Sequence, residues 1–248
     1  MPPPDKRIRL TRNIKKFWDF GNNFYGFTLA EVLVTLGIIG VVSAMTVPSL
    51  IQNHQKKTYV TQLHKFYNEI QQVFNRILTD RNAVNLFEAG FNSSQDIYQT
   101  FKTYLKIVND CGETPTPCFA NEYRGLDNSI YKPLKGDRCK YTLSLASGVA
   151  ICFDSASNGN TLEAPIGFLY VDINGAKGPN IVGRDYFLLF YFNDGSLDEV
   201  NATPICRQSG ICGDYSSPQE ARKSHYCEGN WPAGCFGKIL NDNWEMTY

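Results

Sequence analysis

The stretch GFTLAEVLVTLGIIGVVSAMTVPSL, residues 26–50, decides how the rest of this chain of 248 residues is organised. The apolar run 27–51 holds one charged side chain, Glu31. A helix of that length, at ~1.5 Å per residue, can cross the ~30 Å hydrocarbon core of a bilayer. Six Lys or Arg residues and two acids precede it in residues 1–26. A basic segment before an apolar run is typical of an export or anchoring signal whose basic end stays in the cytoplasm.

The carboxylate of Glu31 is costly in a plain membrane anchor. A charge costs ~2.5–3.5 kcal/mol at the bilayer centre and less near its edge, and the run holds no basic residue to pair with it. Cleavage after Gly26 would create an amine on Phe27, which is four residues before Glu31 on the same helical face. In a stack of identical helices, the amine of one subunit would then neutralise the carboxylate of another and set the register.

The sequence Gly26-Phe27-Thr28-Leu29-Ala30-Glu31 resembles the prepilin cleavage and methylation motif of type IV pilins and type II secretion pseudopilins. The resemblance implies that prepilin peptidase cuts after Gly26 on the cytoplasmic side and that Phe27 is then N-methylated. It also implies that subunits assemble through this helix, with Glu31 as the assembly residue.

Small residues and a proline extend the resemblance along the run. Pro48 lies where type IV pilins commonly carry a helix-kinking proline, since proline removes a backbone donor. Glycines weaken a helix and permit close approach of a neighbour. In several filaments of the family the stretch between such a glycine and the proline loses helicity on assembly. The positions assigned to assembly are Thr28, Glu31, Gly37, Gly40 and Pro48.

Two other export routes compete with this interpretation. Val42-Ser43-Ala44 offers small residues to an ordinary signal peptidase, which would release a soluble protein beginning at Met45. The run could also be a simple uncleaved anchor. The prepilin interpretation is favoured because the apolar run continues past residue 44 and because Glu31 has no use in either alternative.

Residues 52–80 are expected to continue the helix in amphipathic form. Apolar residues recur every three or four positions, which places them on one stripe, and polar residues lie between them. In pilins this half of the long helix packs on the head. His54 and His64 lie in this segment without clustered acids or cysteines and are expected to be solvated. The stripe consists of Val60, Leu63, Tyr67, Ile70, Phe74 and Ile77.

The remaining residues, 81–248, are expected to form a globular head. Residues 93–108 have the pattern of a helix that ends at Val108. Strands are expected on both sides of Ser147-Gly148, and in 166–173 and 185–192. The expected fold is therefore α+β and pilin-like. Its long N-terminal helix packs on an antiparallel sheet of about four strands in 140–200, followed by an irregular, disulfide-rich region in 201–248.

All eight cysteines follow residue 110, which indicates disulfides in an oxidising compartment. Their spacings are not those of a zinc site, and His225 is the only histidine nearby. A Cys111–Cys118 bridge around CGETPTPC is plausible, but spacing does not determine the pairing. The candidates are Cys111, Cys118, Cys139, Cys152, Cys206, Cys212, Cys227 and Cys235.

The segment VDINGAKGPNIVGRDYF, residues 171–187, allows two interpretations. Asp172, Asn174, Asn180 and Asp185 offer oxygen ligands that calcium would accept, although the EF-hand pattern is not met. In the alternative, the segment is a tight connection between strands, and its two aspartates hydrogen-bond the loop backbone. We expect no cofactor, with calcium as the one candidate.

The sequence shows no catalytic motif, and a net charge of zero suggests no nucleic-acid partner. The late aromatic residues allow either an adhesive or glycan-binding surface or a cover for a small disulfide-rich core. These aromatics are Tyr215, Tyr226, Trp231, Phe236 and Trp244.

Together these features predict a non-enzymatic subunit of a type IV pilus or type II secretion pseudopilus, with a mild preference for a minor subunit. Its expected partners are other such subunits, prepilin peptidase and the inner membrane. It would span that membrane once, with a cytoplasmic N-terminus and a periplasmic or extracellular head, before joining a filament. The competing hypothesis is a monomeric membrane-anchored or secreted binding module that uses the Cys-rich head or a calcium loop.

Overall fold

The computed structural model describes residues 26–132, 139–156 and 161–248. The chain divides into two compact units, Met1–Leu50 and Ile51–Tyr248. Helix α1 (Leu29–Asp80) supplies nearly all of the described part of the first unit and begins the second. Apart from Gly26, the predicted basic leader lies outside the described residues.

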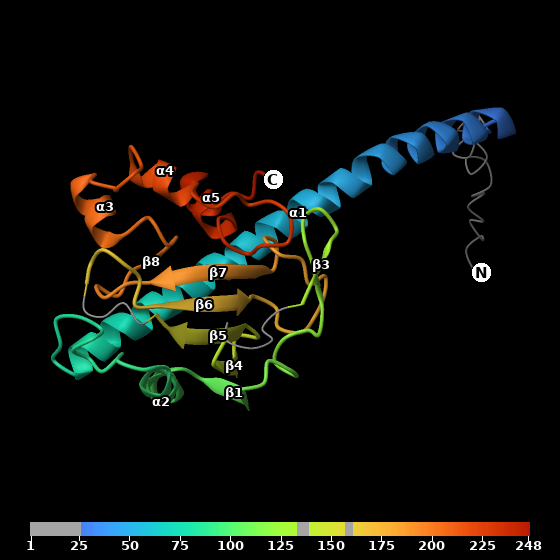
Figure 1. Ribbon diagram of the computed structural model, residues 1–248. Coiled ribbons are helices and arrows are strands. Elements are labelled where there is room, and N and C mark those ends of the chain that lie inside the picture. Colours follow the sequence, from blue (N-terminus) through green and yellow to red (C-terminus); the bar gives the residue numbers. More distant parts are fainter. Residues whose placement is uncertain (1–25, 133–138, 157–160) are drawn as a thin grey trace, which may run out of the picture. The chain divides into compact units, whose positions relative to one another are not determined.

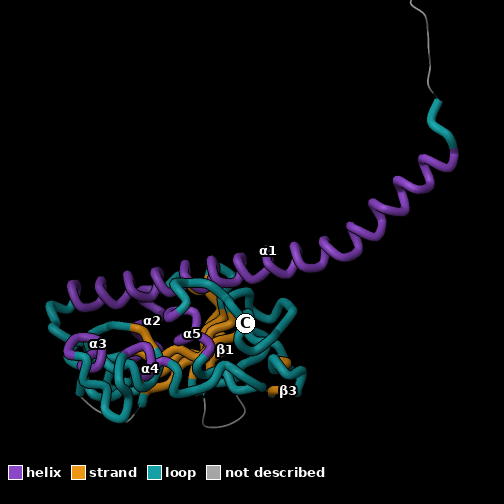
Figure 2. Tube along the Cα trace, turned by 90° about the horizontal axis from the view of Figure 1, so that it is seen from above, coloured by secondary structure: helices purple, strands orange, loops and turns teal. Residues whose placement is uncertain are grey.

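Within the second unit, α1 lies across one face of a β-sheet, and Figure 2 shows the helix on one side of the strands. The amphipathic pattern explains this packing, because its apolar stripe is the buried face. Five of the six stripe residues are buried, while Tyr67 is half-buried and Phe66 and Val73 join them. The buried helix residues are Val60, Leu63, Phe66, Ile70, Val73, Phe74 and Ile77.

The sheet contains six antiparallel strands in the order β1-β4-β5-β6-β7-β8 (Figure 1). Its four central neighbouring strands are the ones expected from the sequence. One further strand extends the sheet at each end: the six-residue β1 in front of the meander and the two-residue β8 behind it. The strands are β1 (Ile107–Gly112), β4 (Tyr141–Leu145), β5 (Ala150–Ser155), β6 (Gly167–Asp172), β7 (Tyr186–Tyr191) and β8 (Leu197–Asp198).

Strand β1 corrects one sequence-based expectation. Helix α2 (Ser94–Tyr104) is capped by Ser93, but it ends before Leu105 instead of at Val108. Leu105 is extended, and Ile107 pairs with Leu145 of β4. The β-branched residues at 107 and 108 favour a strand once a partner is available, and that partner lies almost forty residues away.

Both faces of the central strands are covered, which explains their continuous apolar sequences. Alternate residues of β6 and β7 face the core under α1 or a second cluster on the opposite face. A long connection that includes the two-stranded hairpin of β2 (Tyr123–Arg124) and β3 (Ile130–Tyr131) contributes to this second cluster. Its largest buried members are Phe119, Tyr123, Tyr186, Leu188 and Tyr170.

The eight cysteines form four local disulfides, so no cysteine is free. The plausible Cys111–Cys118 bridge is present, and each pair closes a loop that spans at most 13 residues. These links restrain loops that have little core of their own. The pairs are Cys111–Cys118, Cys139–Cys152, Cys206–Cys212 and Cys227–Cys235.

The C-terminal region is more regular than expected. Its three short helices are α3 (Pro204–Ser209), α4 (Pro218–Arg222) and α5 (Cys235–Asn241). The first two follow Thr-Pro and Ser-Pro pairs in the sequence: Thr203 and Ser217 accept bonds from backbone N–H groups of the first turn, and proline occupies the first helical position. The sequence therefore contained a signal for α3 and α4.

Helix α5 has no local side-chain cap, because its N-cap residue is Gly234. Glu199, next to β8, takes this role: its Oε1 accepts bonds from the N–H groups of Gly234 (2.9 Å) and Gly237 (3.1 Å). A Cβ at Gly237 would collide with the Glu199 side chain and come within 2.7 Å of the Arg222 carbonyl oxygen. Glu199 is fully buried, and its burial raises its pKa to about 8.

The late aromatic residues do not form one exposed surface. Phe236 is buried in the main core, and Trp244 stacks on His64 of α1 with ring centroids 4.0 Å apart. His64 is exposed, as expected, although Trp244 stacks on one face of its ring, and Tyr226 is 76 % exposed. Of the two interpretations of these aromatic residues, the one in which they cover a core describes Phe236 and Trp244.

The raised pKa of Glu199 predicts a dependence of stability on pH. In the unfolded chain the carboxyl group regains a pKa near 4.5, so the folded state binds its proton more tightly. The resulting stability is fully present below about pH 4.5 and is lost as pH rises through about 8. We expect the free energy of unfolding of the disulfide-intact protein to decrease over this window, and to decrease less in Glu199→Gln. Denaturant titrations at about pH 5 and about pH 8 measure both changes.

A matched control for this measurement is Glu220→Gln, at a surface carboxylate that pairs with Lys223. It is expected to keep the wild-type pH dependence. If Glu199→Gln also kept it, the buried carboxyl group would not be responsible.

Candidate processing and assembly site

The residues around the Gly26–Phe27 bond lie outside regular structure. Helix α1 begins at Leu29, so both residues of the bond precede its first turn. Phe27 is 86 % exposed, and Gly26 is exposed as well. A peptidase needs an accessible, non-helical bond because the backbone must be extended in its active site, and this bond meets both conditions.

Thr28 and Glu31 form a reciprocal cap at the start of α1. The N–H of Glu31 donates to Thr28 Oγ1 (3.2 Å), and the N–H of Thr28 donates to Glu31 Oε2 (2.9 Å). The Thr28 hydroxyl also donates to Glu31 Oε2 (2.9 Å). This is a capping box, in which two otherwise unpaired backbone donors are satisfied. The T-x-x-E spacing is a known signal for it, so the sequence alone could have identified this second role of both residues.

The Glu31 side chain remains exposed despite this cap. Among the described residues, no lysine, arginine or histidine forms an ion pair with it. The Glu31 carboxylate therefore lies at the N-terminus of an apolar helix, and its partners within the chain are the neutral N–H and O–H groups of Thr28.

The rest of the apolar run presents exposed apolar side chains on all sides. Its few hydroxyl groups are satisfied within the helix: Thr46 donates to the carbonyl of Val42 (2.9 Å), and Ser49 to that of Thr46 (2.9 Å). The helix continues through Pro48. Gly37 and Gly40 leave open space, since an added Cβ at either would meet no atom within 4 Å. By length and composition α1 is sufficient to cross a membrane.

The four residues named as calcium candidates do come together. Asp172 ends β6 and Asp185 precedes β7, and the carboxylates of both are buried. Asp185 accepts from the N–H groups of Asn180 (2.8 Å) and Ile181 (2.6 Å), while Asp172 accepts from Asn174 (3.1 Å). With its amide turned so that both ends find partners, Asn174 also donates to Asp172 Oδ1 at 2.7 Å.

The second partner of Asp172 is a residue that the sequence did not suggest. Tyr123, in the hairpin over the outer face, donates its hydroxyl to Asp172 Oδ2. Burial raises the pKa of Asp172 to about 8 against the effect of this bond, and the nearby Asp185 raises it further. Burial also raises the pKa of Asp185. The loop thus directs N–H and O–H donors towards both carboxylates, and these bonds hold the connection between β6 and β7.

Within residues 26–132, 139–156 and 161–248, no group of three or more His, Cys, Asp or Glu side chains is placed to hold a metal ion.

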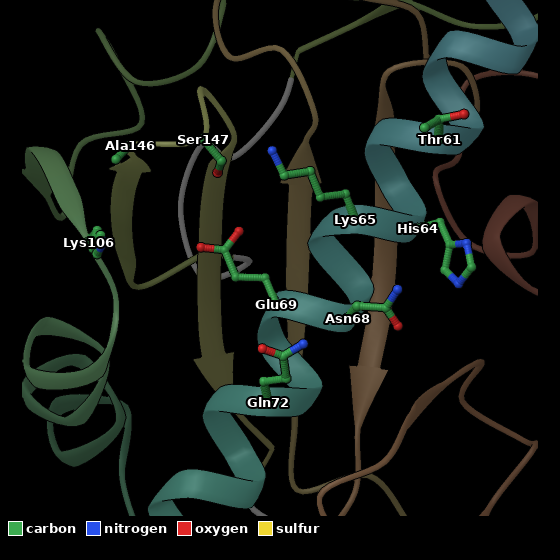
Figure 3. A pocket seen from close by; sticks show the side chains of 9 residues that line it. All are labelled: Thr61, His64, Lys65, Asn68, Glu69, Gln72, Lys106, Ala146 and Ser147. Carbon is green, nitrogen blue, oxygen red and sulfur yellow. The ribbon is translucent and has the colours of Figure 1, made fainter.

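A groove of about 690 Å³ lies between α1 and the turn that joins β4 to β5. Figure 3 shows Lys65 and Glu69 extending from the helix towards Ser147, whereas His64 and Asn68 extend from the opposite side of the helix. Lys106 lines the opposite wall. The groove is open and carries both signs of charge, and its lining shows no nucleophile paired with a base.

The hydrogen bonds of Asp185 predict its contribution to stability. We expect Asp185→Ala to lower the free energy of unfolding by about 2–4 kcal/mol, because two buried N–H donors lose their charged acceptor. Thermal melts with calcium and with a chelator are expected to coincide for the wild type. Calorimetry and denaturant titration measure these quantities.

The matched control is Asp127→Ala. Asp127 also accepts from a backbone N–H, that of Ser129 (2.9 Å), but it lies in an exposed turn. Its removal is expected to cost less than about 1 kcal/mol. A calcium-dependent rise in melting temperature that disappears in Asp185→Ala would instead assign the loop to calcium.

Comparison with known protein families finds one match, in which residues 21–47 fit the prokaryotic N-terminal methylation motif. The match contains the exposed Gly26–Phe27 bond, the Thr28–Glu31 cap and both glycines of the run. No match was found among curated proteins or among solved structures. Proteins with this motif and a pilin-like fold are typically structural and not enzymes. On its α+β fold of a long helix packed on an antiparallel sheet, this chain carries the N-terminal methylation motif that is typical of type IV pilins and pseudopilins.

Proposed function

We propose that this protein is a structural subunit, and more specifically a minor one, of a type IV pilus or type II secretion pseudopilus. In this role it is inserted in the inner membrane, cut after Gly26 by prepilin peptidase, and N-methylated on Phe27. It then joins a filament through the apolar part of α1, with its head outside the membrane.

One observation carries the proposal: an exposed, non-helical Gly-Phe bond is followed directly by a helix whose first turn holds a carboxylate. Cleavage would leave a free amine at Phe27, four residues before the first-turn carboxylate of Glu31. Glu31 Oε2 is already aimed back at the helix start by Thr28, which is where the amine of a staggered neighbour would arrive. The exposed apolar sides of the run then pack against neighbouring helices, and Gly37 and Gly40 allow close approach.

The composition of the head supports a subunit that works outside the cytoplasm. Four disulfides restrain it, and they persist in oxidising compartments. The size of the head and its many cysteines favour a minor subunit over a major one.

Processing is tested on the N-terminal peptide. Mass spectrometry of membrane and sheared-surface fractions from the native host is expected to find a chain that begins at N-methylated Phe27. Gly26→Val is expected to retain the leader, because a side chain at this position blocks the cut. Gly21→Val, another leader glycine, serves as the control and should be processed normally. A chain that begins at Met1 or Met45 would contradict the proposal.

Assembly is tested at Glu31. Glu31→Val should still be cleaved and membrane-bound, but its amount in the sheared filament fraction should fall at least about tenfold, since loss of one ion pair in a low-dielectric contact costs more than ~1.4 kcal/mol. Thr35→Val is a matched control in the same helix, because the Thr35 hydroxyl is satisfied by the Val32 carbonyl (3.0 Å). Unchanged localisation and unchanged assembled species in Glu31→Val would favour the monomeric binding module.

A further inference from the structure

A second groove, of about 590 Å³, lies where α1 enters the head. One wall is formed by α1 residues, among them Asn53, Lys56 and Lys57, and the other by the C-terminal residues Trp244, Glu245 and Met246. We call it the C-terminal groove. Nothing in the processing or assembly of the subunit uses it.

The place of this groove along α1 limits what can occupy it, and here the inference rests on the proposed membrane insertion of residues 27–51. Lys56 follows the last residue of the apolar run by five positions, or ~7.5 Å along a helix. The polar headgroup layer on each side of a bilayer is about 5–8 Å thick. Asn53, Lys56 and Lys57 are therefore held by α1 itself at the depth of the phosphate groups or just above it.

The charge of the groove fits an anion. Residues 52–65 of α1 contain three lysines and no acid. Neither Lys56 nor Lys57 forms an ion pair within the described part of the chain. Glu245 is the one acid among the lining residues, so the lining carries a net positive charge.

The opposite wall supplies an amphipathic surface. Trp244 is half-buried and held by its stack on His64 and by an edge contact with Tyr67, whose ring centroid is 5.2 Å away. Met246 is buried beside it. A fixed tryptophan next to lysines is the combination that proteins place at membrane interfaces, because the ring tolerates the apolar and polar sides of that layer.

We propose that the C-terminal groove binds the headgroup of an anionic phospholipid of the membrane in which α1 is inserted. The ammonium groups of Lys56 and Lys57 meet the phosphate, the Asn53 amide offers a further donor, and Trp244 contacts the glycerol and upper acyl region. The lipid thereby joins the C-terminal segment to α1 and seats the head on the membrane before assembly.

The test uses the full chain in neutral detergent micelles with phosphatidylcholine, titrated with phosphatidylglycerol, while native mass spectrometry counts bound lipid. The wild type is expected to retain phosphatidylglycerol in preference to phosphatidylcholine. Lys56→Gln/Lys57→Gln should weaken its retention roughly 30-fold, since each lysine near an anionic lipid contributes about a fivefold factor. Lys56→Arg/Lys57→Arg keeps the charge and should retain the lipid.

The matched control is Lys65→Gln/Lys106→Gln. It removes the same charge from the groove in Figure 3, and Lys65 is nine residues further along α1, at ~14 Å. It is expected to leave phosphatidylglycerol retention unchanged. Equal weakening in both glutamine variants, or equal retention of the two lipids by the wild type, would overturn the proposal.

Membrane integration separates this inference from the proposed function. The same chains are first extracted from membranes washed at alkaline pH, which removes proteins that are not inserted. Loss of the wild type in the wash would contradict the membrane subunit itself. An integrated wild type whose lipid retention does not depend on Lys56 and Lys57 would contradict the lipid site alone.

Discussion

The structure of the head depends on burial of one stripe of α1 against the sheet. Seven side chains of this helix are buried, and at ~1.5–3 kcal/mol each their burial contributes on the order of 10–20 kcal/mol before entropy is counted. Phe74 occupies the centre, with the rings of Phe91, Phe101 and Tyr191 within about 6 Å of its own. Because α2, the sheet and α5 all pack into this same core, loss of the stripe would remove the partner of each.

The N-terminal part of the same helix lacks such a partner. Its apolar side chains are exposed, so its stability within this chain comes from backbone hydrogen bonds and from the Thr28–Glu31 cap. A membrane or a neighbouring helix would supply the missing apolar surroundings. Glu31 has two uses in this scheme, because the oxygen that closes the capping box is the same one that would face a neighbouring amine. The cap orients the carboxylate before any neighbour arrives.

Buried acids hold the two less regular parts of the head in a similar way. Asp172 and Asp185 anchor the connection between β6 and β7, and Glu199 caps α5 from the end of the sheet. In each case a carboxylate takes up backbone donors that no regular ladder satisfies, which is the requirement of irregular buried backbone. Burial raises the pKa of all three groups, so these anchors also make the stability of the head dependent on pH.

The sequence by itself determined the features that depend on local pattern. The motif at Gly26–Glu31 is a contiguous stretch of sequence. The apolar stripe of α1 follows from apolar residues spaced three to four positions apart, and the four central strands follow from short apolar runs. All of these patterns involve residues close together in the chain. Only the tertiary structure decided the features that depend on contacts between residues distant in the sequence. Residues 105–108 became extended because β4 offered an edge, Phe236 entered the core because α5 lies on the sheet, and Glu199 became a cap because Gly234 left α5 without one. The cysteine pairing was likewise decided by the fold, since spacing allows many pairings and only folded geometry brings two sulfur atoms within bonding distance.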